Sequence, residues 1–198
     1  MYKSGGSMNK RKRDVLKAAS IVFAKYGYRG ATMDEIALEA GVVKGTLYYN
    51  FKNKEEIFNE IIESGISHLR EDVDKVRKMD IDTHEKLREA IKIQLEFFYE
   101  NKEFFKVILS QMWGEEPRQI NLRNSIRKYI YDVREILEEA VRHNVIEQEN
   151  SLLLAHAYFS SITSTALYDL IEKNAEKDQA IEMMLEFTLR GLNYSLQQ

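Results

Sequence analysis

Residues 32–54, TMDEIALEAGVVKGTLYYNFKNK, determine the fold of the amino-terminal part of this chain. Thr32 can cap a helix with its hydroxyl, and Glu35 lies where its carboxylate can reach back to the cap, which is the capping-box pattern. Gly41 follows the apolar face of this helix and most easily adopts the left-handed conformation that ends it. A second short helix then carries Leu47 inward. The pattern predicts a helix-turn-helix whose second helix can read DNA.

The rest of the chain is also predicted to be helical. One proline and nine glycines among 198 residues leave few helix breakers, so we expect an all-α protein. Apolar spacing predicts helices over residues 9–26, 44–51, 54–78, 84–100, 119–143, 151–173 and 178–196, besides the capped helix that precedes Gly41 and a short one ending near Trp113. Residues 9–53 would form a three-helix DNA-binding head, and residues 54–198 a body of about six helices for ligand binding and dimerisation. Residues 1–8 are interpreted as a disordered cloning remnant.

The composition excludes several kinds of site and segment. There is no cysteine, so disulfides and thiolate metal sites are excluded, and we expect a cytoplasmic protein. No apolar run approaches the roughly 18 residues of a membrane span, and the amino terminus has no signal-peptide core. Neither a cofactor nor a metal is predicted.

The charge is distributed unevenly along the chain. The net charge is −3, yet residues 1–54 hold 11 Lys+Arg against 4 Asp+Glu, whereas the remaining residues hold 18 against 28. A basic head on an acidic body indicates that only the head meets a polyanion. The alternative is chance clustering of surface lysines. The basic run at residues 10–13 fits either phosphate contacts or a solvated segment.

Residues 11–58 resemble the DNA-binding region of the TetR family of bacterial repressors. The matching residues are Phe23, Gly27, Thr32, Ile36, Ala37, Gly41, Val42, Lys44, Gly45, Thr46, Leu47, Tyr48, Tyr49, Phe51, Lys52, Asn53, Lys54 and Glu55. The resemblance implies a homodimer, a palindromic double-stranded DNA operator and a small-molecule inducer that binds in the body.

The resemblance also implies contacts with DNA, residue by residue. Lys44, Gly45 and Tyr48 correspond to positions that approach base edges. Positions that hold phosphates correspond to Thr32, Thr46, Tyr49 and Lys54. The chemistry agrees, because lysine can donate to guanine and a tyrosine ring can meet a thymine methyl group.

Two positions in the second helix and its turn depart from the usual family pattern. Val43 stands where a small or hydroxylated residue is commoner, and Asn50 where an aromatic residue or histidine is commoner. Val43 could contact a thymine methyl group or only pack, and Asn50 could bind adenine or a phosphate. These two residues are included in the predicted DNA-binding set, and they affect the operator sequence more than DNA binding itself.

The last two predicted helices are apolar on more than one side, which indicates two packing partners. One face can serve the body and the other a second subunit, in a four-helix contact between protomers. The expected interface residues are Leu154, Tyr158, Ile162, Thr165, Met184, Phe187 and Tyr194. The alternative is a larger core within one chain.

The body is rich in aromatic residues and is predicted to hold an apolar pocket for a lipophilic or aromatic molecule. The candidate ligand-binding residues are Phe98, Met112, Trp113, Tyr129, His156, Phe159 and Thr163. For each aromatic residue the alternative is ordinary core packing. His156 is interpreted first as an interior, hydrogen-bonded histidine.

The sequence therefore predicts a ligand-responsive, sequence-specific DNA-binding regulator, most simply a repressor that its inducer releases from DNA. The alternative is a helical protein-interaction module that does not bind DNA. An enzyme is disfavoured, because none of the four histidines follows a glutamate by three residues, as a di-iron bundle requires. Zinc-protease, phosphate-loop and serine-hydrolase motifs are absent from the sequence as well.

Overall fold

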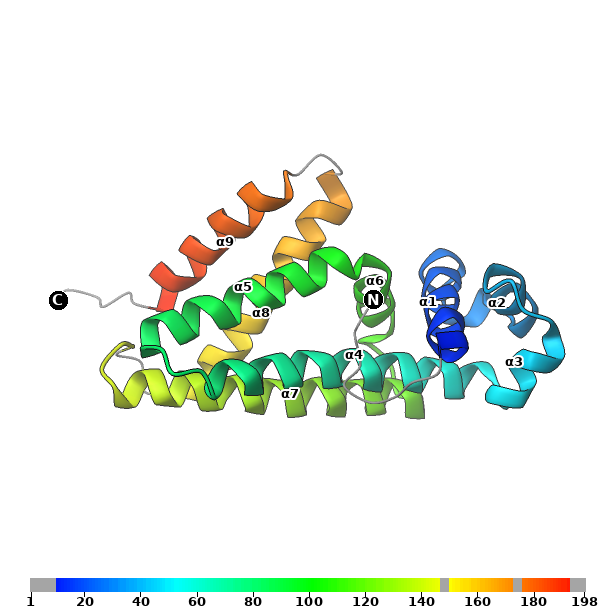
Figure 1. Cartoon of the computed structure of the whole chain (residues 1–198), viewed down its shortest axis with the longest axis horizontal. Coiled ribbons are helices and arrows are strands. Elements are labelled where there is room, and N and C mark those ends of the chain that lie inside the picture. Colours follow the sequence, from blue (N-terminus) through cyan, green and yellow to red (C-terminus); the bar gives the residue numbers. More distant parts are fainter. Residues whose placement is uncertain (1–9, 147–149, 173–175, 193–198) are drawn as a thin grey trace. The chain divides into compact units, whose positions relative to one another are not determined.

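The computed structural model describes residues 10–146, 150–172 and 176–192, and within these ranges all regular structure is helical (Figure 1). The helices of the described ranges are α1 (Lys10–Gly30), α2 (Met33–Glu39), α3 (Lys44–Asn50), α4 (Lys54–Arg77), α5 (Thr83–Glu100), α6 (Lys102–Gln111), α7 (Pro117–Arg142), α8 (Ser151–Glu172) and α9 (Lys177–Leu192). The predicted all-α class is confirmed. The predicted remnant at residues 1–8 lies outside the described residues.

The chain forms two compact units. The first contains the residues up to His68 together with Glu103–Ile126, and the second contains Leu69–Lys102 and the residues from Arg127 onward. Because α4 and α7 each cross this boundary, each contributes to both units. The first unit therefore holds the head together with α6 and the first turns of α7. The predicted functional division at residue 53 stays a prediction.

Local sequence signals fix the helix-turn-helix in the first unit. Thr32 caps α2: its hydroxyl accepts from the Glu35 N–H at 3.2 Å, and the Glu35 carboxylate accepts from the Thr32 N–H at 2.8 Å. Gly41 has φ 63°, the left-handed conformation that the turn requires. Leu47 of α3 is fully buried, so one apolar side chain anchors the second helix. The predicted capping box is confirmed.

Within the described residues, two helix boundaries differ from those predicted by more than one residue. The first helix was expected to end at Tyr26, whereas α1 continues to Gly30 across a break at Gly27, where φ is 69° and ψ is 166°. The helix expected from residue 119 begins at Pro117. Proline fits the first turn of a helix, because its missing N–H would have no helical partner there.

Close packing joins α4 to α6 in the first unit. A Cβ atom added to Gly65 would lie 2.3 Å from Cζ of Phe104, so the absence of a side chain at this position lets the phenyl ring lie against α4. The end of α6 is held by α7, because the Arg123 guanidinium donates to the carbonyl oxygens of Met112 at 3.2 Å and Gly114 at 2.7 Å. These contacts join α4, α6 and the start of α7 within the first unit.

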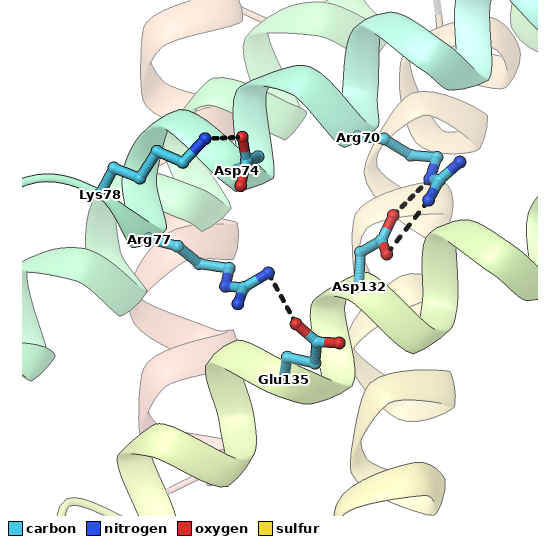
Figure 2. Close-up of polar contacts among 6 residues, drawn as sticks. All are labelled: Arg70, Asp74, Arg77, Lys78, Asp132 and Glu135. Atoms are coloured by element: carbon cyan, nitrogen blue, oxygen red, sulfur yellow. Dashed lines mark hydrogen bonds and ion pairs between the residues drawn. The ribbon is translucent and has the colours of Figure 1, made fainter.

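In the second unit, α5, α8 and α9 pack against one another (Figure 1). Figure 2 shows two ion pairs that join the later turns of α4 and α7: Arg70 with Asp132, and Arg77 with Glu135, the second at 2.6 Å. Exposed pairs of this kind contribute roughly 0–1 kcal/mol each, so they adjust the alignment of the two helices more than the stability. No helix among the described residues is long and apolar enough to cross a membrane.

Candidate nucleic-acid interface and ligand site

The outer surface of α3 carries the side chains that were predicted to meet DNA. Tyr49 is 90% exposed and Tyr48 51%, and Val43, the residue that precedes the helix, is 75% exposed. Both tyrosines therefore point away from the core. Gly45 is also exposed. Exposed aromatic rings beside a residue without a side chain form a surface that can approach a DNA groove closely.

Lys44 is the one charged residue of α3, and it is paired with a residue of α2. Its Nζ atom lies 2.6 Å from Oδ2 of Asp34, and both side chains remain exposed. This hydrogen bond, followed by the carboxylate's charge, raises the pKa of Lys44, so the ammonium keeps its proton throughout the physiological range. Sequence reasoning missed Asp34, although an acidic residue in the first turn of α2 could have indicated it.

Two predicted DNA-contact residues make hydrogen bonds within the head. The Thr32 hydroxyl donates to the Glu35 carboxylate at 2.8 Å, in addition to capping α2. The Asn50 side-chain amide donates to the Thr46 carbonyl oxygen at 2.7 Å, which turns it back along α3. Phosphate contacts by Thr32 and Thr46, and base or phosphate contacts by Asn50, stay predictions.

Lys54, which was predicted to hold a phosphate, makes hydrogen bonds within the first unit. Its ammonium donates to the carbonyl oxygens of Tyr28 at 2.8 Å, Arg29 at 3.2 Å and Ala31 at 2.9 Å. An ammonium has three N–H donors, and each here has a backbone acceptor. Lys54 thus satisfies carbonyl groups at the end of α1 and just beyond it, which have no helical partner. A phosphate contact by Lys54 stays a prediction.

Tyr28 lies at the centre of this junction, another feature that the sequence did not reveal. Its buried ring stacks on Phe23 with centroids 5.6 Å apart and meets Phe58 edge-on at 5.4 Å. The Arg118 guanidinium, at the start of α7, lies 4.0 Å from the ring centroid. The Lys54 ammonium lies 4.9 Å from the same centroid. Burial raises the pKa of Tyr28, so its hydroxyl stays neutral beside these two cations. The end of α1 is therefore joined to both α4 and α7.

The predicted ligand residues of the body divide into buried and surface groups. Phe98 and Tyr129 are buried, and Phe159 and Thr163 are half-buried. His156, in contrast, is exposed, so its interpretation as an interior histidine is wrong; it occupies the outward face of α8. In the first unit, Met112 is half-buried and Trp113 is 81% exposed. An exposed indole does not line an interior pocket, although ligand contacts by these residues stay untested predictions.

A buried polar cluster lies among the aromatic residues of the second unit. The Gln94 amide of α5 donates to the Tyr158 hydroxyl of α8 at 2.6 Å. Among the described residues, the Tyr129 hydroxyl and the Gln94 carbonyl oxygen are buried without a hydrogen-bond partner. Burial raises the pKa of Tyr129 and of Tyr158, so both hydroxyls are neutral donors. Sequence reasoning missed Gln94, although a polar residue between Ile91 and Leu95 on a core face was a usable signal.

The predicted dimer residues need a second correction. Tyr158, Ile162 and Thr165 are buried within the chain, so their side chains are not available to a second subunit. Leu154 and Met184 are half-buried, Phe187 is 64% exposed, and Tyr194 lies outside the described residues. The apolar residues that α8 and α9 do expose are Leu153, Leu167, Tyr168, Ile171, Met183 and Phe187. The outward stripe of α8 is therefore a different one from that predicted.

Comparisons with known proteins agree on one family. A family model described as "Bacterial regulatory proteins, tetR family" matches residues 15–61. A solved Clostridium perfringens protein, described as a candidate regulator of fatty acid metabolism, is 42% identical, with a TM-score of 0.84 over 92% of this chain and 100% of its own.

Two further proteins are informative. The uncharacterized HTH-type transcriptional regulator YhgD of Bacillus subtilis is 33% identical over 120 residues, which cover 56% of this chain and 63% of YhgD. Bacillus subtilis FadR, solved in complex with stearoyl-CoA, is 21% identical, with a TM-score of 0.77 over 90% of this chain and 98% of its own. At that identity, the likeness to FadR shows the fold alone.

Proposed function

Because the chain belongs to the TetR family of bacterial regulatory proteins, we propose that it is a repressor that fatty-acyl thioesters release from its operator. The protein is a ligand-responsive, DNA-binding transcriptional regulator that acts as a homodimer. The proposal adds the DNA-reading residues, the dimer face and the class of ligand. It also includes a cytoplasmic location, where the bacterial chromosome lies, and no catalytic activity, since the relatives are regulators.

The exposed surface of α3 is the observation that carries the DNA-binding part of the proposal. Lys44, Gly45 and Tyr48 offer a cation, a close backbone approach and an apolar ring edge to a major groove. Two copies of α3, one in each protomer, would read half-sites about 34–36 Å apart, which is one turn of DNA. Tyr49 and the backbone around Thr46 would contact the flanking phosphates.

The dimer face proposed here is the exposed apolar surface of α8 and α9. Its residues are Leu153, Leu167, Tyr168, Ile171, Met183 and Phe187. Burying such side chains contributes roughly 25 cal/mol per Å² of apolar area, so a four-helix contact would be favourable. Phe187→Arg should convert the dimer to a monomer in sedimentation and weaken operator binding, whereas Trp113→Arg, an equally drastic change at another exposed ring, should do neither. If the Trp113 variant is monomeric or the Phe187 variant stays dimeric, the proposed dimer face is rejected.

The buried polar cluster supports a ligand site in the second unit. Leaving a buried donor or acceptor unpaired costs about 1–3 kcal/mol, and here the Tyr129 hydroxyl and the Gln94 carbonyl oxygen are both in that position. A ligand with a neutral carbonyl group could accept from Tyr129. An acyl thioester offers such a group together with an apolar chain. The C. perfringens protein is described as a candidate regulator of fatty acid metabolism, and FadR, which shares this fold, was solved with stearoyl-CoA.

The decisive experiment is a titration of an operator selected from random DNA. Stearoyl-CoA should raise the dissociation constant of the operator complex at least tenfold, whereas free coenzyme A should leave it unchanged. Tyr129→Phe should weaken stearoyl-CoA binding about three- to tenfold, the worth of one neutral hydrogen bond. If binding to every duplex is weak and independent of salt, the protein-interaction alternative is favoured.

A further inference from the structure

The pair between Lys44 and Asp34 joins the two helices of the helix-turn-helix on their exposed side. Lys44 lies in the first turn of α3, and Asp34 in the first turn of α2. Their charged groups are 2.6 Å apart, and the side chains are 65% and 59% exposed, respectively. The pair therefore lies on the same surface as the residues proposed to read DNA.

The pair is not needed to hold the two helices together. Ile36, Ala37 and Leu47 are buried between the helices of the head, and their apolar contacts hold α2 against α3. An exposed ion pair adds little to folding stability, because water screens the two charges. A carboxylate that faces a polyanion is also unfavourable for DNA affinity. Neither folding stability nor affinity for DNA therefore explains why Asp34 lies on this surface.

The chemistry of the ammonium group supplies that explanation. A free lysine is a flexible point charge that binds any phosphate, and such contacts carry no sequence information. With one N–H donated to Asp34, two donors remain, enough for the N7 and O6 acceptors of guanine. The Asp34 carboxylate also repels a phosphate that approaches Lys44, whereas it does not repel the edge of a base in the same way.

We propose that Asp34 is a specificity-determining residue, which holds the Lys44 ammonium toward a guanine edge and lowers its affinity for phosphates of non-specific DNA. This inference rests on the proposed DNA-reading role of α3. It makes Asp34 a positioning residue that acts through Lys44. Specificity would then come from a repulsive element as well as from an attractive one.

The test compares Asp34→Ala and Asp34→Asn with Glu39→Ala, a change of equal charge at another exposed acid of α2. Dissociation constants are measured by fluorescence anisotropy between 50 and 200 mM salt, for the selected operator and for a duplex of equal length with scrambled half-sites. Circular dichroism checks that each variant is folded, and the Asn variant retains the size of the side chain should the Ala variant prove unstable.

For both Asp34 variants we expect affinity for the scrambled duplex to rise about five- to tenfold near 0.1 M salt. The salt dependence should steepen by about 0.9, because one more phosphate is neutralised. The ratio of operator to scrambled affinity should fall by a similar factor, and adding Lys44→Ala should abolish the effect of Asp34→Ala. Glu39→Ala should change both affinities together and leave their ratio intact.

The outcomes separate this inference from the proposed function. If the wild-type protein binds no duplex, both the proposed function and this inference fail. If it binds its operator but the Asp34 variants behave like Glu39→Ala, only the role of Asp34 is rejected. A loss of operator affinity with unchanged affinity for the scrambled duplex would also reject it, since Asp34 would then contact a base directly.

Discussion

Replacement of Lys54 by methionine separates two roles for this residue: capping the end of α1 and holding a DNA phosphate. Methionine retains the apolar stem of the side chain and removes the charge. The change would take a donor from the carbonyl oxygens of Tyr28, Arg29 and Ala31, two of which are partly buried. Hydrogen bonds to charged groups contribute about 1.5–3 kcal/mol each, and water can replace the donor at the exposed Arg29 carbonyl. Contributions within one cluster are not additive, so we expect the free energy of unfolding to fall by about 2–4 kcal/mol.

Urea denaturation at neutral pH, followed by circular dichroism, measures this change. For a chain of this size, a loss of 1 kcal/mol lowers the midpoint of thermal unfolding by about 2–4 °C, so a shift of roughly 4–16 °C should accompany it. Lys52→Met is the matched control, because Lys52 is an exposed lysine two residues earlier. Its free energy of unfolding should stay within about 0.5 kcal/mol of the wild-type value.

DNA binding provides the second half of the test. If Lys54 caps α1, the slope of log affinity against log salt should be the same for Lys54→Met as for the wild type. A phosphate contact would instead lower that slope by about 1. The capping role would be refuted by a variant with wild-type stability and a reduced slope.

Three further changes test other contacts of the fold. Arg118→Ala should lower the free energy of unfolding, measured in urea, by about 1–2 kcal/mol, because the buried guanidinium lies on the Tyr28 ring. Arg118→Lys should recover only part of this loss, since lysine lacks the planar group. Gly65→Ala should destabilise the protein by about 1–3 kcal/mol although alanine favours helices, and the double variant with Phe104→Leu should be more stable than Gly65→Ala alone. Above pH 10 the folded protein should lose stability with rising pH. The raised pKa of Tyr129 keeps its hydroxyl protonated in the folded chain, whereas the same hydroxyl ionises in the unfolded chain. The free energy of unfolding, measured at pH 9 and pH 10.5, should therefore fall less with pH for Tyr129→Phe than for the wild type.

The sequence alone predicted the helix-turn-helix well, because its determinants are local. The capping box at Thr32 and Glu35, the turn at Gly41 and the inward Leu47 involve residues a few positions apart. Each depends on hydrogen bonds or backbone conformations that the immediate sequence specifies.

The orientation of α8 was harder to predict from sequence. This helix carries two apolar stripes of similar strength, so spacing cannot tell which one faces the chain's own core. Packing against α5 and α9 buries Tyr158, and the hydrogen bond from Gln94 satisfies its hydroxyl there. His156 consequently faces outward instead of inward.

The sequence by itself determined which segments are helical, that the chain is all-α, and which short helix can meet DNA. Only the tertiary structure decided what the long polar side chains do. Lys54 reaches carbonyl groups 23 to 26 residues earlier, and Arg118 lies over a ring from the first helix. A helix can be specified by neighbours within one or two turns, but the partner of a flexible cation is whichever group packing brings within its reach.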